Sequence, residues 1–336
     1  MKNLLYIGNQ LKHNKGTVTS IDSLGPLLEK EGYAIAYASS KPIKLFRLID
    51  MLYTVLKNRK KVDVVLIDTY STLNYYYAFF VSQLCRILKL KYIPILHGGN
   101  LPHRLNQYPK LSKRIFNTAY KIISPSKYIK SEFETLGYSN VKCIPNSIEI
   151  NKYPTETKKY DSVRLLWVRS FSEIYNPMLA VTILKFLQDQ GFSAELCMIG
   201  PEKDGSLQQC KKYAKELNVD VYFPGKLSKT EWIKLSYDYN IFINTTNYDN
   251  MPVSVIEAMA LGFPIISTNV GGMPFLIDNH KDGVLVNPDD ANGFVNQIKN
   301  IISNPKEAIM LGNNARKKAE SFNWDLIKQE WISLLK

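Results

Sequence analysis

Asp249 and Glu257 flank the expected start of a short helix that follows a loop and precedes an apolar run. Pro252 is expected at the first helical position, and Gly262 is expected to cap the other end. A helix N-terminus presents unpaired N–H groups and a partial positive charge, which suit a phosphate. Carboxylates on either side accept hydrogen bonds from sugar hydroxyls. Since a phosphate between hydroxyl-bearing sugars is the outline of a nucleotide sugar, this segment predicts a nucleotide-sugar site.

The elements that must position this segment alternate between short apolar strands and amphipathic helices. The first half of the chain predicts strands at residues 4–7, 34–38, 62–67, 92–96, 122–124 and 141–144, with intervening helices that include 17–30 and 127–136. The second half predicts strands at 163–168, 194–199, 221–223, 241–244, 264–267 and 283–286. Such alternation predicts parallel sheets covered by helices on both faces.

Polar residues without periodicity, 151–161, interrupt this alternation, and we place a linker there. The chain is therefore expected to form two doubly wound, Rossmann-like α/β domains, residues 1–155 and 156–323. Ligands bind at the carboxyl ends of the strands in such domains, so we expect an interdomain cleft. The last segment, 324–336, carries a helical apolar stripe.

Charge is unevenly divided along the chain. Residues 1–160 contain 25 Lys and Arg against 10 Asp and Glu, a net charge of +15, whereas residues 161–336 have a net charge of −2. A basic half favours polyanions such as anionic lipid headgroups, a diphosphate-linked acceptor or nucleic acid. A solubilising surface is the alternative. Since the basic residues form no recognised nucleic-acid-binding module, we expect no nucleic-acid partner.

Residues 41–61 combine this positive charge with many apolar side chains. The mixture suits a helix that lies on an anionic membrane surface, and it suits equally a core-facing helix with a basic outer side. Residues 69–85 form the longest uncharged stretch, but their polar side chains favour a buried helix over a membrane span. The four cysteines are widely spaced without a metal or redox motif, which fits a reduced cytosolic setting.

The segment that starts at Asp249 resembles the donor-site signature of retaining glycosyltransferases of family 4, which have the GT-B fold. That signature has two acids separated by seven residues, then an Ala-Met-Ala-like helix and Gly-x-Pro. Further segments resemble the same family and extend the likeness over most of the chain: His97-Gly98-Gly99, Ser124-Pro125-Ser126, Ile144-Pro145-Asn146-Ser147 and Leu165-Leu166-Trp167-Val168-Arg169.

The resemblance implies a role for each candidate residue. Arg169 would bind the donor diphosphate, Asp249 would hold the sugar hydroxyls, and His97 would bond a sugar hydroxyl or assist at the anomeric centre. Glu257 would bind the ribose. The remaining donor contacts would come from Lys15, Gly16, Lys226, Leu227, Met251, Val253 and Ser254. The last helix, 324–336, would cross back to the first domain.

The chain departs from the family pattern at several positions. Asp249 replaces the usual Glu, and Ser147 replaces a Gly. The family usually has a second phosphate-binding Lys five or six residues after Arg169, where this chain has Ile174 and Tyr175. Lys15, beside Gly16, is a candidate substitute for that cation.

The resemblance implies a retaining glycosyltransferase that moves a sugar from a nucleotide-diphosphate sugar to a hydroxyl group, and the basic first half favours a glycan or polyprenyl-diphosphate-linked acceptor. We expect it to act in surface polysaccharide biosynthesis, in the cytoplasm or peripherally on the inner face of the membrane. No Asp-x-Asp pair ends a strand, so we expect no metal and no cofactor. The alternatives are a non-catalytic nucleotide-sugar-binding protein and a GT-B nucleotide-sugar epimerase.

Overall fold

The computed structural model describes residues 2–10 and 19–336 of the chain. The described chain divides into two compact units, the first made of Met1–Pro145 with Ile327–Lys336 and the second of Asn146–Leu326. Lys15, Gly16 and Thr17, which the sequence places at the first strand-to-helix turn, lie outside the described residues.

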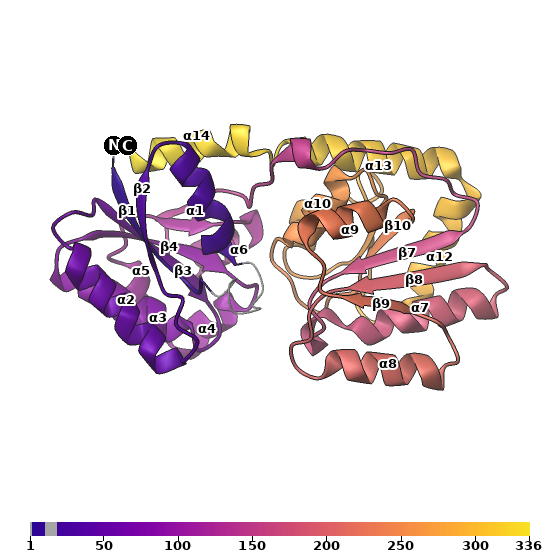
Figure 1. Cartoon of the computed structure of the whole chain (residues 1–336), viewed down its shortest axis with the longest axis horizontal. Coiled ribbons are helices and arrows are strands. Elements are labelled where there is room, and N and C mark those ends of the chain that lie inside the picture. Colours follow the sequence, from indigo (N-terminus) through magenta and orange to yellow (C-terminus); the bar gives the residue numbers. More distant parts are fainter. Residues whose placement is uncertain (1, 11–18) are drawn as a thin grey trace. The chain divides into compact units, whose positions relative to one another are not determined.

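A parallel sheet with the strand order β2-β1-β3-β4-β5-β6 forms the centre of the first unit. Its strands are β1 (Asn3–Ile7), β2 (Ala34–Ala38), β3 (Val64–Tyr70), β4 (Lys91–His97), β5 (Ile122–Ser124) and β6 (Val141–Cys143). The helices around it are α1 (Ser20–Lys30), α2 (Lys44–Asn58), α3 (Tyr75–Ile87), α4 (Leu101–Gln107), α5 (Pro109–Phe116) and α6 (Lys127–Thr135) (Figure 1).

The second unit repeats this architecture around a parallel sheet with the order β12-β11-β10-β7-β8-β9. Its strands are β7 (Val163–Val168), β8 (Ala194–Ile199), β9 (Tyr222–Gly225), β10 (Ile241–Asn244), β11 (Ile265–Thr268) and β12 (Val284–Val286). Its helical elements are η2 (Ile150–Lys152), η3 (Glu173–Tyr175), α7 (Pro177–Asp189), α8 (Ser206–Glu216), α9 (Lys229–Ser236), α10 (Val253–Ala260), α11 (Met273–Leu276), α12 (Ala291–Ser303) and α13 (Pro305–Glu320).

Burial explains why these apolar runs form strands. Every residue of β10 and β11 is buried, as expected for central strands that helices cover on both faces. Trp167 of β7 packs within the core of the second unit, and Tyr92 of β4 packs within that of the first. The predicted α/β class with two doubly wound sheets is confirmed, and the ends of each predicted strand lie within about three residues of their expected places.

The second unit begins earlier than the linker expected at residues 151–161. Ile148, Ile150 and Tyr153 are buried in its core, which fixes this stretch to the second unit. The last helix, α14 (Trp324–Leu335), begins in the second unit and ends in the first, where its Trp331 is buried. Lys142 and Lys328 add ion pairs between this helix and the body of the first unit.

Two expected helix starts differ from the structure by one or a few residues. Pro252 has an extended backbone and caps α10, so Val253 is the first helical residue rather than Pro252. Helix α1 begins at Ser20 after its cap Thr19, whose N–H donates to the Asp22 carboxylate at 3.0 Å. Gly262 follows α10 with a positive φ, as the sequence predicted.

Among residues 2–10 and 19–336, no helix is both long and apolar enough to cross a membrane.

Candidate functional site

The Arg169 guanidinium lies beside the Asp249 carboxylate at the carboxyl edge of the second sheet. Arg169 directly follows β7, and Asp249 lies in the loop after the neighbouring strand β10. Nη2 of Arg169 is 2.5 Å from Oδ2 of Asp249, and both side chains are nearly buried. Burial raises the pKa of the Asp249 carboxyl above its usual range, while the charge of Arg169 opposes the rise. The structure therefore brings together two predicted site residues.

Tyr175 occupies one of the two positions where the sequence lacked the expected Lys. Its ring lies under the Arg169 guanidinium, with the guanidinium carbon 3.9 Å from the ring centroid. The surrounding segment is fixed by the loop after β10, because the Asn247 N–H donates to the Ile174 carbonyl at 2.9 Å. Tyr175 thus orients the Arg169 guanidinium, and it does not supply the positive charge of the expected Lys.

A glycine pair after β11 holds the loop that carries Asp249. The Gly272 N–H donates to the Asp249 carbonyl at 3.0 Å. Gly271 has a φ of +51°, and a Cβ atom there would lie only 2.2 Å from the same carbonyl oxygen. A side chain at this position would push the acidic loop away from Arg169. The sequence reasoning did not single out either glycine.

Among the residues that the structure describes, hydrogen-bond donors without a partner lie at the N-terminus of α10, beside this acidic loop. The N–H groups of Val255 and Ile256 both bond to the Pro252 carbonyl, which leaves those of Val253 and Ser254 outside the helical pattern. The Ser254 hydroxyl is buried and has no partner among the described residues. These three donors suit a phosphate oxygen.

Met251 is buried immediately before this helix, and its carbonyl accepts a 3.0 Å hydrogen bond from the Asn146 side chain. Asn146 belongs to the Ile-Pro-Asn segment identified in the sequence. Its side chain therefore positions the start of α10 from a distant part of the chain.

Glu257, the second predicted acid, is buried on α10 and already has two partners. Its carboxylate accepts a 2.8 Å hydrogen bond from the Tyr153 hydroxyl and an ion pair from Lys229. Burial, and then the charge of Glu257, raises the pKa of Tyr153 above its usual range. Buried Tyr153 fixes the Glu257 carboxylate in place. Lys229 is half-exposed, so its position on this carboxylate is open to a ribose hydroxyl.

Lys226 and Leu227 follow β9 at the same sheet edge, the former exposed and the latter half-buried.

His97, the candidate in the first unit, belongs to a polar cluster that the sequence did not predict. Its Nε2 lies 2.8 Å from Oδ1 of Asp68, which also accepts a 3.1 Å hydrogen bond from the Tyr6 hydroxyl. Asp68 is buried on β3 and its Oδ2 has no partner among the described residues. Burial, and then the charge of Asp68, raises the pKa of Tyr6 well above its usual range.

This cluster determines what His97 can do. An ionised Asp68 only accepts hydrogen bonds, so Nε2 of His97 is the donor in this contact. The ring of Tyr70 packs against His97 with centroids 5.0 Å apart. His97 is thus held in one orientation by Asp68 and Tyr70.

The sequence reasoning missed Asp68, Tyr153 and Lys229. Only Asp68 had a local signal, since it is an acid that ends a buried apolar run. Among the described residues, no group of three or more His, Cys, Asp and Glu is placed to hold a metal ion.

Two parallel doubly wound units, with polar residues at the carboxyl edges of their sheets, define the architecture of GT-B glycosyltransferases. The computed structure superimposes on HepE of Anabaena in complex with UDP-glucose with a TM-score of 0.80, covering 100% of this chain and 99% of that one at 15% identity. At that identity the likeness shows the fold alone.

Residues 150–318, half of the chain, match the family described as glycosyl transferases group 1, and the chain belongs to this family. It is 23% identical over 219 residues to the UDP-Gal:alpha-D-GlcNAc-diphosphoundecaprenol alpha-1,3-galactosyltransferase of Escherichia coli, with 58% of this chain and 54% of that protein aligned. It is 21% identical over 278 residues to the amylovoran biosynthesis glycosyltransferase AmsK of Erwinia amylovora, with 74% and 65% aligned. The chain thus spans between half and two thirds of these curated relatives.

Proposed function

We propose that this protein transfers a sugar from a nucleoside-diphosphate sugar to a hydroxyl group of an acceptor. The observation that carries the proposal is the Arg169–Asp249 pair at the edge of the second sheet, beside the unused donors of Val253 and Ser254. The Arg169 fork and the helix N-terminus suit the diphosphate, Asp249 suits the sugar hydroxyls, and Glu257 suits the ribose. Met251, Lys226 and Leu227 also belong to the proposed donor site, as do Lys15 and Gly16, which lie outside the described residues.

In the proposed reaction, the bond between the anomeric carbon and the donor phosphate oxygen breaks, and its electron pair stays on the leaving phosphate. The acceptor oxygen forms the new bond to the anomeric carbon and loses its proton to that phosphate. The anomeric configuration is retained when the acceptor enters on the face that the phosphate leaves. Arg169 and the N–H groups of α10 stabilise the negative charge that develops on the leaving group. His97 would bond a sugar hydroxyl through Nδ1.

This charge stabilisation would need no metal ion, because a permanently charged guanidinium and a helix N-terminus already oppose the phosphates. The proposed reaction is therefore independent of added divalent cations and of any cofactor.

The proposed acceptor is a glycan or a polyprenyl-diphosphate-linked sugar, in the biosynthesis of a surface polysaccharide. Support comes from the similar proteins, one named for a diphosphoundecaprenol acceptor and one for amylovoran biosynthesis. The net charge of +15 on residues 1–160 suits both a diphosphate and an anionic membrane. We accordingly propose a site of action on the cytoplasmic face of the membrane.

Thermal unfolding with UDP-, GDP-, ADP- and dTDP-sugars, measured with Mg²⁺ and again with EDTA, tests the donor site. We expect one nucleotide to raise the unfolding temperature selectively, because a ligand that binds only the folded protein adds about 2.7 kcal/mol at a hundredfold excess over Kd. UDP-glucose and UDP-galactose are the first candidates, since similar proteins bind or use UDP-sugars by name. The absence of any shift would contradict the proposed donor site, and a shift abolished by EDTA would contradict metal independence.

A further inference from the structure

Helix α2 in the first unit exposes large apolar side chains on the face that points away from the core. Met51 and Val55 are buried on its inner face. On the outer face, Leu45 is 64% exposed and Tyr53 is 60% exposed. Phe46 and Ile49 lie between them and Leu56 lies one turn beyond Tyr53, and these three side chains are also exposed. These outer positions lie within about 100° of one another at 3.6 residues per turn. The outer face of α2 is therefore an apolar stripe, where a surface helix normally carries polar residues.

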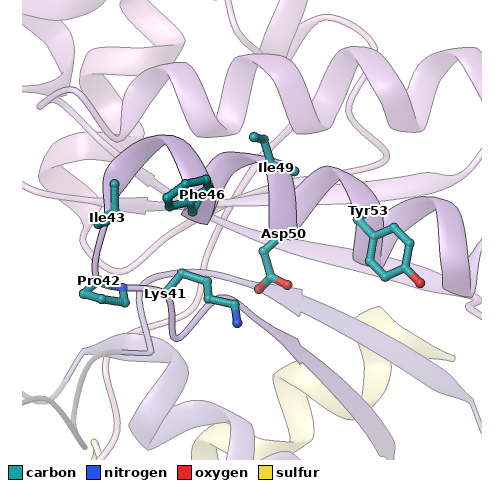
Figure 2. A pocket seen from close by; sticks show the side chains of 7 residues that line it. All are labelled: Lys41, Pro42, Ile43, Phe46, Ile49, Asp50 and Tyr53. Atoms are coloured by element: carbon teal, nitrogen blue, oxygen red, sulfur yellow. The ribbon is translucent and has the colours of Figure 1, made fainter.

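A shallow groove of about 400 Å³ follows this stripe at the N-terminal end of the helix. Its apolar lining consists of Pro42, Ile43, Phe46, Ile49 and Tyr53, and Figure 2 shows these side chains along α2 and the segment before it. The charged side chains in the lining are Lys41 and Asp50. The groove continues the apolar stripe onto the preceding segment, so the exposed apolar surface is contiguous.

Positive charge lies at both ends of this apolar stripe. Six exposed cations flank it: Lys41, Lys44, Lys57, Arg59, Lys60 and Lys61. Asp50 is the single acidic residue between residues 41 and 61. An apolar stripe between two basic ends is complementary to a lipid bilayer with anionic headgroups, in which acyl chains meet the stripe and phosphates meet the cations.

Arg47 fixes the start of this surface to the sheet. Its buried guanidinium donates to the carbonyls of Lys41 and Pro42 at 2.7 and 2.8 Å, and to the Asn9 side chain at 3.0 Å. Asn9 follows β1, and α2 starts after β2, so both lie at the carboxyl edge of the first sheet. His97 ends β4 at that same edge. The groove therefore begins at the edge where the first unit carries its polar cluster.

We propose that the outer face of α2 docks this protein on an anionic lipid bilayer, with its apolar stripe among the acyl chains and its basic ends on the headgroup phosphates. Docking in this way brings the carboxyl edge of the first unit to the membrane surface, where a lipid-linked acceptor presents its diphosphate. The inference rests on the proposed function only for the reason why the protein would dock on a membrane. The docking surface itself contains no donor-site residue.

Co-sedimentation with vesicles tests the docking surface without any sugar donor. We expect the full chain to bind vesicles of phosphatidylcholine with 30% phosphatidylglycerol at least about tenfold more tightly than pure phosphatidylcholine, and more weakly at high salt. The triple variant F46S/I49S/Y53S is expected to lose binding by about tenfold or more, because three apolar anchors no longer enter the bilayer. The charge variant K57Q/R59Q/K60Q/K61Q is expected to lose the preference for phosphatidylglycerol.

The matched control I309S/M310S/L326S removes three exposed apolar residues from the second unit and should bind vesicles as the wild type does. All four proteins are first compared for their donor-induced thermal shift, so that a folded donor site is established independently of lipid. Wild-type binding that is absent, or that survives the F46S/I49S/Y53S change, would overturn the proposal. A wild-type dimer in gel filtration that this triple change dissociates would instead assign the stripe to a second copy of the chain and would also overturn it.

Discussion

Arg169→Ala is expected to lower sugar transfer by about a thousandfold, because the proposed reaction has one strand-end guanidinium to stabilise the leaving diphosphate. The expected second cation is absent, since Tyr175 occupies its place and packs against the Arg169 guanidinium. Within the second unit, removal of Arg169 therefore leaves the N–H groups of α10 opposite the phosphates. Initial rates of nucleoside-diphosphate release, measured with the donor that stabilises the protein, report this loss directly.

A matched control lies on the same strand. Arg164, near the start of β7, pairs with Asp161 at 3.0 Å, at the opposite end of the strand from Arg169. Arg164→Ala removes the same side chain from an Arg–Asp pair far from the carboxyl edge, so its transfer rate should remain within about twofold of the wild type. If Arg169→Ala kept wild-type turnover, the assignment of the diphosphate to this residue would be wrong.

Asp249→Asn is expected to separate nucleotide binding from sugar transfer. Asn keeps the shape of the side chain and can still accept the 2.9 Å hydrogen bond that Asp249 receives from the Asn250 N–H. It removes the negative charge that pairs with Arg169. A free diphosphate then no longer competes with a carboxylate for the guanidinium, so UDP should bind at least as tightly as it binds the wild type. Transfer should fall about a hundredfold, because the charged acceptor for the sugar hydroxyls is lost.

Isothermal titration with UDP, alongside the transfer rate, measures both halves of this expectation. Asp161→Asn is the control, since it removes the exposed partner of Arg164 and should change neither quantity. Undiminished transfer by Asp249→Asn would contradict a role for this carboxylate in holding the sugar. Loss of UDP binding would show instead that the carboxylate holds the donor site together.

Sequence reasoning could predict both sheets because each strand is a short apolar run with polar or Gly-containing flanks. The bounds of β7 and β8 match their expected ranges to the residue. It could also predict that Arg169 and Asp249 follow strands, and hence lie at a sheet edge. Their ion pair could not be predicted in the same way, because it depends on β7 and β10 being neighbours in the sheet. This strand order is a property of the folded sheet.

The same limit applies to the partners of the other candidates. Tyr153 and Lys229 reach Glu257 from two different segments, and Asp68 reaches His97 from the adjacent strand. The spacing of residues within one segment does not predict contacts between different segments. Tyr153 looked like part of a polar linker in the sequence, although its burial makes it part of the second unit's core.

The exposed apolar face of α2 was likewise undecidable from sequence. Residues 41–61 fitted a membrane-surface helix and a core-facing helix equally well. The structure shows that one face of this helix packs on the core through Met51 and Val55, while Phe46 and Ile49 on its outer face are exposed.

Transfer of a labelled sugar is the most direct test of the central claim that this protein is a catalyst. The donor that gives the largest thermal shift is incubated, with EDTA, with GlcNAc-diphosphoundecaprenol in phosphatidylglycerol-containing vesicles, and the label in the lipid fraction and the released nucleotide are measured together. We expect equal amounts of labelled lipid and nucleoside diphosphate, and neither with Arg169→Ala. A donor that stabilises the protein but yields neither product would contradict catalysis and would indicate a nucleotide-sugar-binding protein.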